Sequence, residues 1–129
     1  MNRTLKMAMV TAASFLLGAG AVQVLHAQAK PPAYLVAEVN VRDKAGYEKE
    51  FLPPTLKTMK EAGGKYLAGG FEKAVGLSGI PPANRYVIVE FDNMDKAKGW
   101  YEGGQREHER TVGSKYADFR VIGVEGASQ

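Results

Sequence analysis

The segment YVIVEFD, residues 86–92, decides the fold, because its side chains alternate with a period of two. Such alternation predicts a half-buried strand. One face of this strand is apolar and carries Val87, Val89 and Phe91. The other face is mixed and carries Tyr86, Ile88 and Glu90.

Three further segments predict strands on either side of this one. They are residues 34–41 (YLVAEVNV), with Leu35, Ala37, Val39 and Val41 on the apolar face, residues 65–77 (KYLAGGFEKAVGL) and residues 119–124 (FRVIGV). Gly69-Gly70 inside the second segment indicates a bulge or bend. A turn-rich loop is expected over residues 78–85 (SGIPPANR).

Two helical segments separate the strands. The first covers residues 45–62, with Asp43 as N-cap, and is expected to break at Pro53-Pro54 and to begin again there, because proline disrupts a helix interior. The second begins after Asn93 or Asp95, is weakened at Gly103-Gly104, and continues from residue 105 to about 116.

The resulting order, β-α-β-β-α-β, predicts the α+β ferredoxin-like arrangement. Its four-stranded antiparallel sheet has the spatial strand order four-one-three-two, with two helices on one face. The other face is bare, and small soluble domains usually hide such a face against a partner. We therefore expect a homodimer. The predicted domain covers residues 33–126, after a linker at 30–32 and before a tail at 127–129.

The first 29 residues predict export. Arg3 and Lys6 precede an apolar run over residues 7–22, and the small-residue site Ala27-Gln28-Ala29 follows. This is the layout of a cleaved secretory signal peptide, with cleavage after Ala27 or Ala29. The mature protein is then periplasmic or secreted and free of the membrane; the alternative is an N-terminal membrane anchor. The run is short for a bilayer span, which needs about 20 residues.

Composition excludes several function classes. The chain has no cysteine, so disulfides, thiol catalysis and cysteine-ligated metals are absent. Without Arg3 and Lys6, fifteen basic side chains face fourteen acidic ones, and the two signs are interspersed, which speaks against nucleic-acid binding. The one histidine after residue 29, His108, lies in a charged stretch expected to be a solvated helix face. No metal or other cofactor is expected.

Polar side chains gather on the bare face of the predicted sheet. The first and third strands are central neighbours, and the fourth lies beside the first. Asn40 lies on the polar face of the first strand, and the candidate ligand-binding residues there are Tyr34, Glu38, Tyr86, Glu90 and Arg120. If Glu38 and Glu90 lie together in a partly dry space, the pKa of one carboxyl would be raised, and that group could shuttle a proton. Arg120 could instead bind a substrate anion. A purely structural ion-pair network is the alternative.

Four blocks of sequence resemble the family called domain of unknown function 1330. They are Ala33 to Val36, Gly63 to Gly70, Arg85 to Phe91 and Ala97 to Tyr101, within a likeness that runs from about residue 33 to 126. The resemblance implies a dimeric α/β barrel in which two ferredoxin-like sheets face each other. It implies no catalytic residue, because the family has no settled activity.

The chain departs from the family pattern in two places. The run after Tyr101 lacks the usual serine and tyrosine and has Gly103 and Arg106, and the usual Glu-Gly pair after the second strand is Ser78-Gly79. Three hypotheses stay open. The first is a small-molecule-binding protein, and whether it is also a cofactor-independent enzyme is left open. The second is a non-catalytic structural or interaction protein. The third, by architectural analogy alone, is haem binding through His108.

Overall fold

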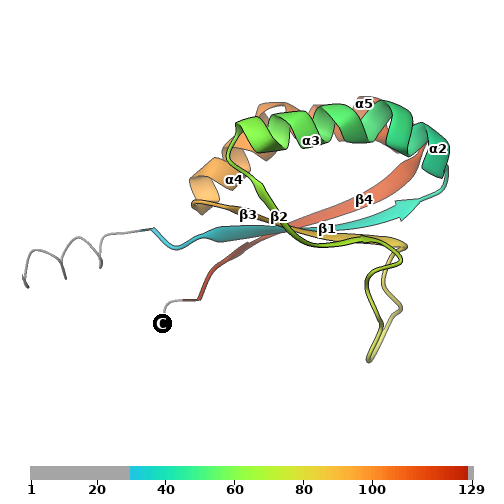
Figure 1. Cartoon of the computed structure of the whole chain (residues 1–129), viewed down its shortest axis with the longest axis horizontal. Helices are drawn as coiled ribbons and strands as arrows, with labels where there is room; N and C mark the ends of the chain where they lie inside the picture. Colours follow the sequence, from blue (N-terminus) through green and yellow to red (C-terminus); the bar gives the residue numbers. More distant parts are fainter. Residues whose placement is uncertain (1–29, 128–129) are drawn as a thin grey trace, which may run out of the picture. The chain divides into compact units, whose positions relative to one another are not determined.

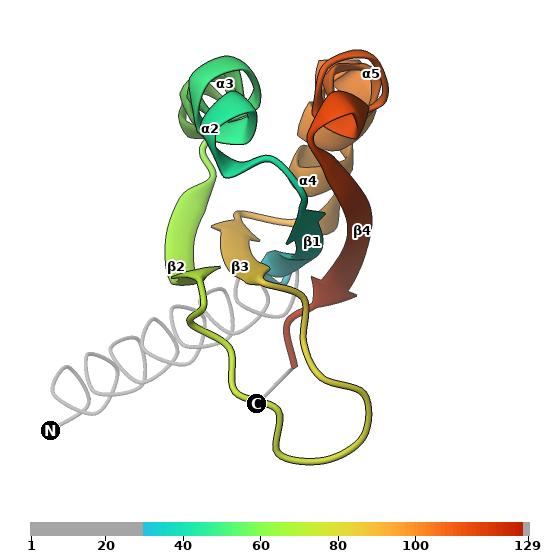
Figure 2. The same ribbon diagram turned by 90° about the vertical axis from the view of Figure 1, so that its right-hand side faces the viewer.

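The computed structural model of this chain describes residues 30–127, which form a two-layer α+β domain (Figure 1). Two helical arms cover one face of a four-stranded sheet, and no helix of residues 30–127 lies on the other face (Figure 2). The strands are β1 (Ala33–Val41), β2 (Lys65–Phe71), β3 (Arg85–Phe91) and β4 (Ala117–Glu125). The helices are α2 (Lys44–Gly46), α3 (Leu52–Glu61), α4 (Met94–Trp100) and α5 (Arg106–Thr111).

The sheet is antiparallel with the order β2-β3-β1-β4, which confirms the predicted ferredoxin-like topology. Alternation along β1 and β3 places Leu35, Val39, Val87 and Val89 beneath the helices, where all four are buried. Two clusters of apolar side chains fill this layer. One surrounds Phe91 and Ala97, and the other surrounds Tyr47, Phe51 and Ala117.

The predicted break at Pro53-Pro54 is wrong. A π-helical turn, Tyr47–Phe51, joins α2 to α3 without a gap, and the amide of Leu52 donates to the carbonyl of Tyr47. The prolines lie in the first turn of α3, where a missing N–H costs little. The widened turn relieves the clash that a proline ring makes with the carbonyl four residues earlier.

The second helical arm also contains a π-helical turn. Residues Tyr101–Gln105 join α4 to α5, and Gly104 departs from helical geometry there with φ 159° and ψ −29°. Asn93, and not Asp95, is the N-cap of α4, because its side chain accepts from the amide of Lys96. Helix α5 ends at Thr111, earlier than predicted, and a 3-10 turn, Gly113–Lys115, leads into β4.

Strand β2 is shorter than predicted and ends at Phe71, so the predicted continuation to residue 77 is wrong. Glu72 turns the chain with φ 55°. A long connection, residues 72–84, then hangs on the side of the sheet away from the helices (Figures 1 and 2). Asn84 fixes its base, because its side-chain amide exchanges two 2.8 Å hydrogen bonds with the backbone of Val41.

The predicted signal peptide falls on residues 1–29, which lie outside the described residues. Within residues 30–127, no helix has both the length and the hydropathy needed to cross a membrane.

Strand β2 contains a bulge, but the register shift lies between Tyr66 and Ala68, two residues before the predicted position at Gly69-Gly70. Gly69 adopts φ +101°, and a Cβ there would collide with the backbone carbonyl of Tyr86. We predict that Gly69→Ala lowers the free energy of unfolding by at least about 2 kcal/mol, from backbone strain and this collision.

Gly99 supplies the matched control, because it lies in α4 and a Cβ there meets nothing within 4 Å. Gly99→Ala should raise the free energy of unfolding by about 0.5–1 kcal/mol. Urea unfolding of both variants measures the difference, and equal effects of the two substitutions would contradict the described bulge.

Candidate functional site

A cavity lies between the two helical arms and the covered face of the sheet. Its free volume is about 70 Å³. One water needs about 10–15 Å³ by such a measure, and an apolar cavity of about 150 Å³ binds benzene, so a ring compound would fit here only if the open side of the cavity widens. Leu56 and Tyr66 line it and are 39% and 42% exposed, so the cavity reaches the surface beside α3 and β2.

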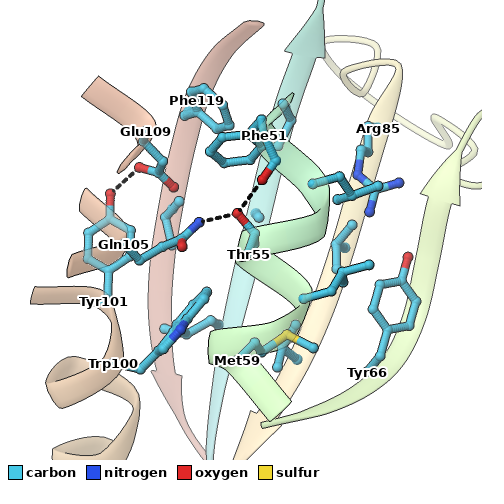
Figure 3. A pocket seen from close by; sticks show the side chains of 18 of the residues that line it. Phe51, Thr55, Met59, Tyr66, Arg85, Trp100, Tyr101, Gln105, Glu109 and Phe119 are labelled. Atoms are coloured by element: carbon cyan, nitrogen blue, oxygen red, sulfur yellow. Dashed lines mark hydrogen bonds between the residues drawn. The ribbon is translucent and has the colours of Figure 1, made fainter. Parts of the chain in front are cut away.

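The wall of the cavity is mostly apolar, with a few polar groups at its two sides (Figure 3). Met59 and Trp100 contribute apolar surface, and Trp100 also packs on Phe91, with 5.6 Å between the ring centroids. Trp100 therefore packs in the core, and the same side chain lines the cavity. Small-molecule sites commonly combine an apolar wall with a few convergent polar groups.

Arg85 is the most unusual group in the wall. It is the first residue of β3 and is paired with Val39, so its side chain lies on the covered face and is only 7% exposed. The Nε atom has no hydrogen-bond partner. Instead, the guanidinium carbon lies over two rings, 5.0 Å from the centroid of Phe71 and 5.7 Å from that of Tyr47.

No carboxylate in residues 30–127 lies within ion-pair distance of Arg85. The hydroxyl of Tyr47, which is also buried, interacts with this group: burial raises the pKa of the hydroxyl, and the charge of Arg85 and a hydrogen bond from its side chain oppose the increase. A buried cation without an anionic partner is expensive.

The second helical arm contributes a hydrogen-bonded polar group opposite Arg85 (Figure 3). Tyr101 donates to Glu109 across 2.6 Å, and buried Gln105 donates to the hydroxyl of Thr55 across 3.0 Å. Burial raises the pKa of the Glu109 carboxyl, whereas the hydrogen bond from Tyr101 and the charge of Arg106 lower it. The pKa of Tyr101 rises to about 12, chiefly through burial, so its hydroxyl stays a donor at neutral pH.

His108 does not lie on a solvated helix face, so that prediction is wrong. Its ring stacks on Phe51 with 4.7 Å between centroids, and its Nε2 contacts the Phe51 carbonyl oxygen at 2.9 Å. Because a carbonyl only accepts, Nε2 carries the proton in this contact. No cluster of three or more potential metal ligands occurs within the described part of the chain.

The sequence-predicted residues lie on the opposite face of the sheet, as three rows across the strands. An apolar row of Ile122, Val36 and Ile88 separates two polar rows, which are Val124-Tyr34-Glu90-Lys65 and Arg120-Glu38-Tyr86-Gly70. Arg120 and Glu38 form an ion pair at 3.3 Å.

The two predicted carboxylates do not meet within one protomer. Glu38 is opposite Tyr86 and Glu90 is opposite Tyr34, four residues further along, which corresponds to about 13 Å. Asn40 is exposed near the end of β1. A shallow hollow does adjoin Glu38, Tyr86 and Arg120, with its remaining wall from the 72–84 connection.

Sequence reasoning missed Arg85 and Glu109. The predicted strand began at Tyr86, one residue too late to show that Arg85 shares the face of Val87 and Val89. Glu109 lay within a stretch that was interpreted as solvated. The signal that could have found it is its spacing, since Tyr101, Gln105 and Glu109 recur every four residues and share one face of a helical arm.

The fold and the cavity define a small ferredoxin-like α+β domain with a largely apolar hollow between its layers. The chain belongs to the family described as domain of unknown function (DUF1330), whose model matches residues 32–127. A solved structure, the RPA0582 protein of unknown function from Rhodopseudomonas palustris, shares the fold with a TM-score of 0.52. It is 17% identical, and the match covers 78% of this chain and 85% of that one. Comparison with curated proteins gives no match.

The raised pKa of Glu109 predicts a pH-dependent cost. A carboxyl whose pKa is higher in the folded than in the unfolded state, here above 4.5, destabilises the fold where it is ionised. This cost is fully present above the folded pKa and disappears as the pH falls below 4.5. We predict that Glu109→Gln, which keeps an acceptor for Tyr101, unfolds at higher urea than wild type at pH 7.

At pH 4 this advantage of Glu109→Gln should shrink toward zero. The exposed Glu102→Gln is the control, and its effect should be small at both pH values. Urea midpoints that differ equally at pH 7 and pH 4 would show that ionisation of Glu109 carries no cost.

Proposed function

We propose that this chain is a small-molecule-binding protein whose ligand occupies the cavity between the helical arms and the sheet. The observation that carries the proposal is the cavity itself, which joins an apolar wall to a few buried polar groups, Arg85 and Gln105 among them. Interiors of proteins are normally packed without such space, so a hollow at the layer interface needs an occupant or a purpose. Whether bound molecules react there is a separate question.

The open-face residues support a second element of the proposal, a homodimer. Val36, Ile88 and Ile122 form an apolar row, and Ile122 is 37% exposed. The connection over residues 72–84 lies on the same side and exposes Val75, Leu77 and Ile80 by 79%, 94% and 92%. A monomer would leave this apolar surface in water, whereas two facing sheets bury it in a closed two-fold assembly.

The hollow beside Glu38, Tyr86 and Arg120 is the second candidate for ligand binding. In the proposed dimer it would be closed by the partner sheet. It is the weaker candidate because Arg120 already pairs with Glu38 and its side chain is 70% exposed, whereas Arg85 is buried and has no anionic partner in residues 30–127. A non-catalytic interaction protein, the alternative function, would need no ligand at either place.

We also propose that residues 1–29 direct export and are removed, so that the domain acts in the periplasm or outside the cell. The amino-terminal charges, the apolar run and the small-residue site support this. Because the chain has no cysteine, the exported domain would be stabilised by packing and association without disulfides.

The cavity proposal is tested by filling the hollow. Ala37 lies on β1 in the cavity wall, so Ala37→Leu places extra carbon atoms inside it. We expect small aromatic probes such as indole, benzamide and benzoate to raise the melting temperature of wild type. A probe at a hundred times its Kd adds about 2.7 kcal/mol. Ala37→Leu should weaken this binding at least tenfold.

Ala45→Leu, the same substitution at an exposed site in α2, is the matched control and should bind as wild type does. Circular dichroism checks that both variants fold, because overpacking costs about 1–3 kcal/mol. The proposal fails if no probe stabilises wild type, or if Ala37→Leu binds unchanged.

The homodimer is tested by placing a charged side chain in the apolar row of the open face. Multi-angle light scattering of residues 30–129 at micromolar concentration should give the mass of a dimer. Ile122→Glu should give a monomer, because a buried unpaired carboxylate opposes association. Thr111→Glu, on the exposed surface of α5, is the control and should stay dimeric. A wild-type monomer, or a dimeric Ile122→Glu, would contradict this interface.

A further inference from the structure

Arg85 lies in the cavity wall as a charge that the described chain does not neutralise. It is 7% exposed, its Nε has no acceptor, and no carboxylate of residues 30–127 is within ion-pair distance. The rings of Phe71 and Tyr47 contact the guanidinium. Such cation–π contacts partly offset the charge, but they leave the Nε hydrogen without an acceptor. The group that is missing from this environment is an anion.

The shape of the guanidinium narrows the choice of anion. Its N–H groups form a planar fork that matches the two oxygens of a carboxylate, and such pairs are short and strong. The cavity is also small, at about 70 Å³. The two coplanar oxygens of a carboxylate match this planar fork, and a carboxylate loses less hydration than a doubly charged phosphate when it enters a largely apolar site. The Tyr47 hydroxyl accepts a hydrogen bond from Arg85 but supplies no negative charge at neutral pH, because burial raises its pKa.

The remaining residues of the cavity wall indicate which kind of carbon skeleton the ligand has. Met59, Trp100 and Phe119 contribute apolar and aromatic surface, which favours a compact aromatic or branched carbon skeleton. On the opposite side Glu109 accepts a hydrogen bond from Tyr101. Its carboxylate repels a second negative charge, so a dianion is disfavoured there.

We propose that the cavity binds a small aromatic monocarboxylate, with its carboxylate paired to Arg85 and its ring against Trp100. This inference rests on the cavity being a ligand site, as argued under Proposed function, and adds the class of ligand and the residue that selects it. The buried guanidinium, whose Nε has no acceptor and which has no anionic partner in residues 30–127, carries the inference.

Fluorescence of Trp100 provides the measurement, because it is the one tryptophan of the sequence and lines the cavity. The probes are benzoate and benzamide, which have nearly the same shape and differ in charge. Titration of the mature protein with each probe gives a Kd from saturable quenching. We expect benzoate to bind at least tenfold more tightly than benzamide.

Three variants assign this preference to a residue. In Arg85→Gln the two probes should bind within about threefold of each other, since a neutral amide offers no charge to pair. Arg85→Lys keeps the charge without the planar fork and should give an intermediate preference; it also serves if Arg85→Gln does not fold. Arg110→Gln removes an exposed arginine of α5 that pairs with Glu107, and should behave as wild type.

The outcomes separate this inference from the one it rests on. Equal saturable binding of benzoate and benzamide by wild type overturns the carboxylate assignment and leaves the cavity as a binding site. A benzoate preference that persists in both Arg85 variants overturns the role of Arg85. No saturable quenching by either probe overturns the inference and the cavity proposal together.

Discussion

The antiparallel pairing of β1 with β3 is the constraint on which the rest of the structure depends. Its register divides the residues of both central strands between two environments. Leu35, Val39, Val87 and Val89 go beneath the helices, and Val36 and Ile88 go to the open face. A shift by one residue would exchange the two sets. The same register sends Arg85, opposite Val39, into the covered layer, where no anion of the described chain meets it.

The two faces therefore have different chemistry and different proposed roles. The covered face has a cavity whose wall contains Arg85, a cation without an anionic partner in the described chain. On the open face, Arg120 forms an ion pair with Glu38. A buried charge without a partner lowers the stability of the fold. The same charge strengthens the binding of an oppositely charged ligand, because the ligand forms the ion pair that the fold lacks. A paired charge beside an apolar row is the usual composition of an association surface. The two proposed roles, ligand binding in the covered layer and association across the open face, follow this difference.

The fold could be predicted from the sequence because periodicity is strong in the two central strands, and their order with the helices permits few topologies. The helical arms were harder. Pro53-Pro54 predicts a break by local rules, but a π-helical turn accommodates both prolines, and no local rule signals that turn. The end of β2 was misplaced because residues 72–77 keep an apolar character although Glu72 turns the chain away.

The candidate site could not be predicted, because its key residue lay one position outside the predicted strand. Arg85 shares the face of Val87 and Val89, and alternation extended by one residue would have placed a lone arginine among buried side chains. That contradiction between residue type and position marks functional sites more often than it marks errors. Glu109 needed tertiary information, since only the packing of the two arms shows that a charged helix also lines a cavity.

A crystal structure of the mature protein with benzoate tests the central claim most directly, because it shows which group neutralises Arg85. The account predicts a carboxylate oxygen of benzoate about 2.8 Å from the guanidinium nitrogens, with the ring between the helical arms and the sheet. A guanidinium paired instead with a carboxylate of the protein itself, in the presence of benzoate, would contradict it.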